Sequence, residues 1–173
     1  MAELDGETYS SLEALGICTV DAGGEQNIAD VAAMYAELGK RVVAVCDKQS
    51  VDNRRAIEDA VEQLFMHDKA SMEKLVLTES DAAAFERFAA FVDWPSHITD
   101  NVDLDEELLT AFRKYFNWTK GNWGIADFLA QCEEDEMPEW IRETCASLKV
   151  LFDDLEETDD GDTEDLAADA PDE

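Results

Sequence analysis

Short apolar runs alternate with amphipathic segments in the first half of the chain. The runs at 17–20, 41–46 and 74–77 have the length and the Val, Ile and Leu content typical of buried strands. Between them, apolar residues recur at helical spacing over 28–38 and 56–65, which predicts two helices. The predicted order is therefore β-α-β-α-β. Helical crossovers of this kind connect parallel strands.

The second half of the chain has helical spacing throughout. Helices are predicted around 85–92, 104–116 and 123–132, and a last one beginning near Pro138. The aromatic residues at this spacing are expected to form a hydrophobic core rather than a stacking surface. The predicted fold class is α/β, with a partial Rossmann-like parallel sheet followed by an α-helical extension.

This pattern divides the chain into four predicted segments. They are an N-terminal lead-in at 1–11, the α/β region at 12–78, the helical extension at 79–152 and an acidic tail at 153–173. The tail holds 12 acidic residues and no Lys or Arg, with few apolar residues to bury. We expect it to be disordered, either as a solvating terminus or as an electrostatic segment for a basic partner.

The net charge of the chain argues against several classes of protein. The 173 residues include 43 acids and 13 Lys plus Arg, a formal net charge of −30, of which about −18 lies outside the tail. This argues against a stand-alone nucleic-acid binder and against adhesion to an anionic membrane. No apolar run approaches the roughly 18–20 residues of a membrane span, and no signal peptide is evident. The four cysteines form no CxxC pair, so reduced thiols and a cytoplasmic location are expected.

Candidate chemistry lies at the predicted strand ends. Asp21 and Asp47 each follow an apolar run directly. Ligands of open parallel sheets bind beyond the carboxyl ends of strands, and paired carboxylates there suit Mg²⁺. Asp47 could equally cap the turn or the following helix. The acid pair and later lysine of a response-regulator receiver are not present in order.

Several segments together resemble a known family. They are, in order, LEALGICTVDAGG, KRVVAVCDKQS and SMEKLVL within 12–77, then WTKGNWGIADFLAQC and MPEWI downstream. In order and spacing they resemble the Toprim domain and carboxyl-terminal region of OLD-family (overcoming lysogenization defect) ATP-dependent endonucleases. The resemblance covers about 12–152 and implies a Toprim-like fold and metal-dependent hydrolysis of DNA.

The resemblance also implies site residues. Asp47 matches the first Asp of the family's Asp-x-Asp metal motif, and Gln49 stands in place of the second. Glu73 resembles a downstream acidic ligand. These three would hold Mg²⁺ or Mn²⁺, with Asp47 also counted as catalytic. Lys120 resembles the catalytic lysine that stabilises negative charge on the phosphate.

The chain departs from the family at its start. The family's first-strand Glu-Gly-x-Thr-Glu segment has no counterpart, and no GxxxxGK[ST] motif of an ATPase is present. We therefore expect the carboxyl-terminal piece of a longer endonuclease, a split subunit or a truncated gene. Such a chain would reach DNA within a larger assembly, with an ATPase domain or subunit, or by homo-oligomerisation to cover a missing strand.

Other residues have less specific interpretations. His67 and His97 are expected at the surface. Asp52 is expected to cap the helix after Asp47, and 133–136 to form a loop. Arg54 and Arg55 are expected on a solvated helix face, although they could meet phosphate. The alternative function is a non-catalytic acidic interaction module, a degenerate Toprim remnant that binds a basic partner or mimics nucleic acid.

Overall fold

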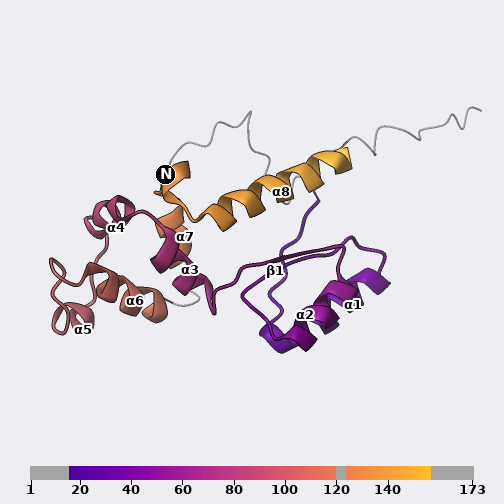
Figure 1. Ribbon diagram of the computed structural model, residues 1–173, viewed down its shortest axis with the longest axis horizontal. Helices are drawn as coiled ribbons and strands as arrows, with labels where there is room; N and C mark the ends of the chain where they lie inside the picture. Colours follow the sequence, from indigo (N-terminus) through magenta and orange to yellow (C-terminus); the bar gives the residue numbers. More distant parts are fainter. Residues whose placement is uncertain (1–15, 120–123, 157–173) are drawn as a thin grey trace, which may run out of the picture. The chain divides into compact units, whose positions relative to one another are not determined.

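The structure, a computed structural model, describes residues 16–119 and 124–156, with side chains as far as residue 151 (Figure 1). Residues 21–144 form one compact unit. Residues 16–20 and 145–156 belong to a second unit. The fold is mixed α/β, with mostly helices and a small parallel sheet of two strands in the described residues.

The first part of the larger unit is a parallel strand pair with two helices. In order it contains the 3-10 turn η1 (Glu25–Asn27), α1 (Ile28–Glu37), β1 (Val43–Cys46), α2 (Val51–Ala60) and β2 (Gln63–Met66). β1 and β2 run parallel, with Val43 opposite Gln63 and Cys46 opposite Met66. Figure 1 shows α1 and α2 side by side along one side of the strands. Their shared core is Ala44, Cys46 and Ile57, all buried.

Local sequence explains where these helices begin and end. α1 ends at Glu37, and Gly39, two residues later, has φ +73°. The N–H of Gly39 donates to the carbonyl of Ala36, and that of Lys40 donates to the carbonyl of Tyr35, which is the Schellman pattern. α2 begins at Ser50, whose hydroxyl oxygen accepts the N–H of Asn53. The helix expected over 28–38 and its terminating glycine are confirmed.

The second part of the larger unit is helical. Its elements are α3 (Met72–Glu79), α4 (Ala82–Ala89), α5 (Ser96–Thr99), α6 (Leu108–Trp118), α7 (Gly124–Leu129), the 3-10 turn η2 (Glu134–Glu136) and the first residues of α8 (Glu139–Glu156). Phe85, Phe88, Phe112, Phe116 and Phe128 are buried together in its core. The expectation that aromatics at helical spacing form core is confirmed for these residues.

Two of the expected strands are wrong, and the helix expected over 56–65 ends earlier than predicted. Residues 17–20 form no strand, and Val20 is 48% exposed. The run 74–77 lies in α3, because Ser71 caps a helix there and four apolar residues fit a helix as well as a strand. Leu64 and Phe65 lie in β2 rather than in a helix, because Val61 adopts an extended conformation and ends α2 at Ala60. The second strand of the sheet is therefore 63–66.

The carboxyl-terminal end of the chain differs in part from expectation. α8 continues to Glu156, so the first four residues of the expected tail, 153–156, are helical. Residues 157–173, and the lead-in at 1–11, lie outside the described residues. Within the described ranges, no helix combines the length and the apolar character needed to cross a bilayer.

Candidate functional site at the carboxyl edge of the strand pair

Asp47 and His67 meet at the carboxyl edge of the strand pair. Each residue directly follows its strand, and the last residues of the two strands are paired in register. The residues that come next after the two strands are therefore neighbours. Nε2 of His67 lies 2.9 Å from Oδ1 of Asp47. The Asp47 side chain is 42% exposed, whereas the His67 side chain is only 1% exposed.

The ring of His67 has a defined environment. Its Nδ1 accepts the backbone N–H of Lys69 at 3.2 Å. A neutral imidazole that accepts at Nδ1 carries its hydrogen on Nε2, the atom that faces Asp47. The Nε2 atom is buried, and its contact with Oδ1 lacks the alignment of a hydrogen bond. The carboxylate is thus within ion-pair distance of a buried N–H that has no aligned acceptor.

Trp140 covers the same ring. The two ring centroids are 4.9 Å apart, and the planes meet at 76°, an edge-to-face arrangement. The expectation that His67 lies at the surface is wrong: it is among the buried polar residues, at 2% exposure. No local pattern indicates this contact, because Trp140 comes 73 residues later in the chain.

Backbone and amide contacts fix the loop after β1. The N–H of Lys48 donates to the carbonyl of Lys69 at 3.1 Å, which ties the two strand-end loops together. Nε2 of Gln49 donates to the carbonyl of Asp47 at 2.8 Å. Oε1 of Gln49 accepts a hydrogen bond from Nδ2 of Asn53 at 2.6 Å. The Gln49 amide therefore shapes the loop, and one acceptor position of its oxygen is already in use.

Charged side chains surround this edge. Lys69 contacts Glu79 at 2.8 Å and Asp68 at 3.1 Å. The hydrogen bond from Lys69 lowers the pKa of Asp68, and those two carboxylates, Glu79 first, raise the pKa of Lys69. Burial, followed by the charge of Asp47, raises the pKa of the Cys46 thiol. The carboxyl edge of the strand pair thus carries both positive and negative side chains.

The remaining candidates are Glu73, Lys120 and Asp21. Glu73 lies in the first turn of α3, whose N-cap Ser71 accepts the N–H of Lys74 at 3.2 Å. Lys120 lies outside the described residues. Oδ1 of Asp21 accepts the N–H of Gly23 at 2.7 Å, so Asp21 stabilises a turn.

Two expectations about neighbouring residues are also decided. Asp52 is in the first turn of α2 and is not its cap, because Ser50 takes that position. Arg54 pairs with Glu58 one turn later on α2, at 2.7 Å, as expected for a solvated helix face.

The residues fit a divalent cation only in part. Mg²⁺ requires several oxygen ligands. Asp47 offers one half-exposed carboxylate. Within the part of the chain that the structure describes, no three His, Cys, Asp or Glu side chains are grouped closely enough to hold a metal ion. The described donors are therefore an incomplete set, and a complete site needs ligands from elsewhere.

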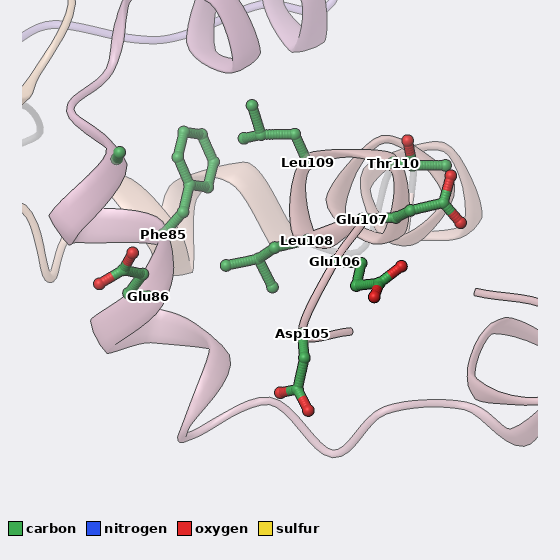
Figure 2. Close-up of a pocket in the computed structure, with 9 residues that line it drawn as sticks. Phe85, Glu86, Asp105, Glu106, Glu107, Leu108, Leu109 and Thr110 are labelled. Carbon is green, nitrogen blue, oxygen red and sulfur yellow. The ribbon is translucent and has the colours of Figure 1, made fainter. Parts of the chain in front are cut away.

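A separate hollow lies between α4 and the start of α6 (Figure 2). It has a volume of about 440 Å³ and is lined by Ala82, Phe85, Glu86 and residues 105–110. Four acids line it: Glu86, Asp105, Glu106 and Glu107. Figure 2 shows that the labelled residues come from the two helices and from the turn before α6. Asp47, Gln49 and Glu73 are not among the residues that line it.

The acidic segment 133–136 has a structural role. In place of the expected loop, η2 is a 3-10 turn in which the Glu136 side chain accepts the N–H of Glu133 at 2.7 Å. Glu136 also pairs with Arg87 of α4.

No protein-family model, curated protein or solved structure matches this chain.

Proposed function

We propose that this chain supplies part of a Mg²⁺- or Mn²⁺-dependent site for hydrolysis of DNA phosphodiesters, in a Toprim-like fold of the OLD-endonuclease type. The observation that supports this most is the position of Asp47. Its half-exposed carboxylate follows a parallel strand, at the edge where such sheets bind ligands. A buried histidine contacts one of its oxygens, so the carboxylate is held at the edge rather than left free in solvent.

Each residue has a distinct proposed role. Asp47 binds the cation and Glu73 supplies a second acid from the start of α3. Gln49 contributes a neutral oxygen beside its structural contacts, and Lys120 holds the phosphate. The cation, when bound, offsets the phosphate charge and lowers the pKa of a coordinated water. Because the described donors are incomplete, the remaining ligands come from another segment or another subunit.

The net charge shapes the proposed assembly. A chain with a formal charge of −30 repels DNA, so the basic DNA-holding surface lies on a partner such as an ATPase subunit or domain. A second copy of this chain could also supply the missing ligands. We place this function in the cytoplasm, where thiols stay reduced, because the four cysteines are free.

The decisive test is Mn²⁺ binding by this chain on its own, in which another segment or a second copy of the chain supplies the remaining ligands. We expect Mn²⁺ to raise the thermal unfolding midpoint of the wild type. The shift should vanish in Asp47→Asn and persist in Asp59→Asn, a control that removes the same charge from an exposed position on α2. Equal shifts in all three proteins would refute Asp47 as a ligand. Plasmid nicking with Mn²⁺ and candidate ATPase partners then tests the reaction itself.

The acidic hollow favours a second candidate, an interaction module for a basic partner. Its four acids lie close to apolar Phe85 and Leu108, a combination that suits a Lys- or Arg-containing segment. This candidate predicts that a basic partner isolated with the protein binds more weakly when Glu86 and Glu106 are changed to Gln. The same two changes should leave Mn²⁺ binding at Asp47 intact. Loss of partner binding without any Mn²⁺ effect in the wild type would favour this candidate over the nuclease.

A further inference from the structure

We infer that His67 is a positioning residue for the Asp47 carboxylate, a role that rests on the proposed function of Asp47 as a cation ligand. The inference starts from burial. A histidine at 2% exposure, with Nε2 facing a carboxylate oxygen at 2.9 Å, is a costly arrangement unless the contact has a use. An apolar residue could fill the same space under Trp140 without that cost.

The His67 ring has contacts on three sides, so its orientation is fixed and it can restrict the position of the Asp47 carboxylate. The backbone N–H of Lys69 holds Nδ1, and the edge-to-face contact with Trp140 holds the ring plane. The third side faces Asp47. Because Nδ1 accepts a hydrogen bond, the neutral ring presents an N–H and not a lone pair to the carboxylate. His67 therefore presents an N–H at 2.9 Å from Oδ1 of Asp47 and is not itself placed to bind a cation.

The contact involves only one carboxylate oxygen. Oδ1 is the atom next to Nε2, and the side chain as a whole remains 42% exposed. Fixing one oxygen from the buried side leaves the other for a ligand on the exposed side. Groups that contact metal ligands in this way restrict their rotation, and removing such a group weakens metal affinity about 10–100-fold.

Two substitutions separate the two ring nitrogens. His67→Gln can place an amide N–H near the position of Nε2, whereas the shorter side chain of His67→Asn reaches only the position of Nδ1. The amide oxygen of the introduced asparagine can still accept the N–H of Lys69. If His67 positions Asp47 through Nε2, we expect the Asn variant to bind Mn²⁺ about tenfold more weakly than wild type, and the Gln variant to recover most of this loss. The measurement is titration of free Mn²⁺ by electron paramagnetic resonance, on full-length variants whose folding is checked by circular dichroism.

A structural role predicts a different pattern. If His67 only fills space, both variants should lose affinity alike, in proportion to their loss of thermal stability. Trp140→Leu is a matched control, because it removes the ring cover without touching either nitrogen. Equal affinity losses in the Gln and Asn variants would overturn the inference, and so would wild-type affinity in both.

A second readout does not depend on the cation. Long-range ¹⁵N NMR of the His67 ring should show Nδ1 as the hydrogen-bond acceptor and hydrogen on Nε2, and Asp47→Asn should shift the Nε2 resonance. Asp59→Asn should leave it unchanged. If the wild type does not bind Mn²⁺ but this shift occurs, the proposed function fails while the contact between His67 and Asp47 stands. If Asp47→Asn does not move the resonance, the positioning role is refuted whether or not Mn²⁺ binds.

Discussion

The guanidinium of Arg87 and the carboxylate of Glu136 form a two-point ion pair that joins α4 to the turn before α8. Nη1 of Arg87 donates to Oε1 at 2.8 Å, and Nη2 donates to the other oxygen. Nη2 also donates to the carbonyl of Gln131 at 3.3 Å. The two residues lie 49 positions apart, so the ion pair links the two ends of the segment that contains α5, α6 and α7.

Glu136 should make the unfolding free energy depend on pH at low pH. Its hydrogen bonds with Arg87 and with the N–H of Glu133 lower its pKa from 4.5 to about 2. A lowered pKa in the folded state stabilises the protein above the unfolded value, and this contribution is lost as pH falls from 4.5 towards 2. We expect wild type to have a higher unfolding midpoint than Glu136→Gln at pH 6, and the gap to narrow by pH 2.5. Calorimetry across this range measures it, with Glu134→Gln as an exposed control whose gap should not change in this way.

Truncation of Phe112 should lower the free energy of unfolding far more than truncation of the exposed Phe91. It is fully buried and contacts the rings of Phe85 and Phe88 at centroid distances of 5.1 and 5.8 Å. Phe112→Ala removes these contacts and leaves a cavity, so we expect a loss of about 3–5 kcal/mol in the free energy of unfolding. Urea denaturation measures it. Phe91→Ala deletes the same atoms from a side chain that is 73% exposed, and it should cost less than about 0.5 kcal/mol. Similar losses in both variants would contradict the assigned core.

Gly39 should be sensitive to substitution for a backbone reason alone. Its φ is +73°, and no atom lies within 4 Å of the position that a Cβ would occupy. Gly39→Ala therefore introduces no clash but strains the left-handed conformation, by about 1–2 kcal/mol. Asn tolerates this conformation better, so Gly39→Asn should cost less. Chemical denaturation of the two variants gives the order, and an Asn variant as unstable as the Ala variant would argue against this helix ending.

The cysteines should differ in their rate of alkylation. Burial, followed by the charge of Glu136, raises the pKa of the Cys132 thiol to about 11, so very little of it is the reactive thiolate at pH 8. Cys18 and Cys145 are exposed, and Cys46 is buried. Treatment with iodoacetamide at pH 8 should modify the two exposed cysteines first, as peptide mass spectrometry would show. Modification of Cys132 at the same rate would contradict its assigned environment.

β1 and the helices α1, α4 and α6 could be predicted from sequence because their signals are local. The β-branched run 41–46 contains β1, and Gly39 marks the end of the helix before it. β2 cannot be predicted from the sequence, because Val61, Leu64 and Phe65 continue the apolar spacing of α2. The change of structure depends on the backbone at Val61 and on pairing with β1. Four apolar residues at 74–77 cannot distinguish helix from strand, although the capping serine before them is a usable signal.

The candidate site could be predicted only in part for a related reason. Asp47 can be predicted as a candidate because it directly follows a recognisable strand. The contact with His67 required the position of β2, which the apolar spacing had concealed. The cover from Trp140 required long-range packing that no local pattern encodes. The sequence therefore identified the carboxylate, and the tertiary structure identified the residue that contacts it.

The register of the strand pair has a consequence for changes in chain length. Asp47 and His67 are the next pair after Cys46 and Met66 in the register of the two strands. Their contact therefore depends on the number of residues in each strand. One residue inserted into either strand would place a different neighbour opposite Asp47, and it would turn the side chains after it to the other face. An insertion between α2 and β2 leaves both counts unchanged. Insertions at 61–62 should therefore keep the contact between Asp47 and His67, and insertions within 43–47 or 63–67 should break it.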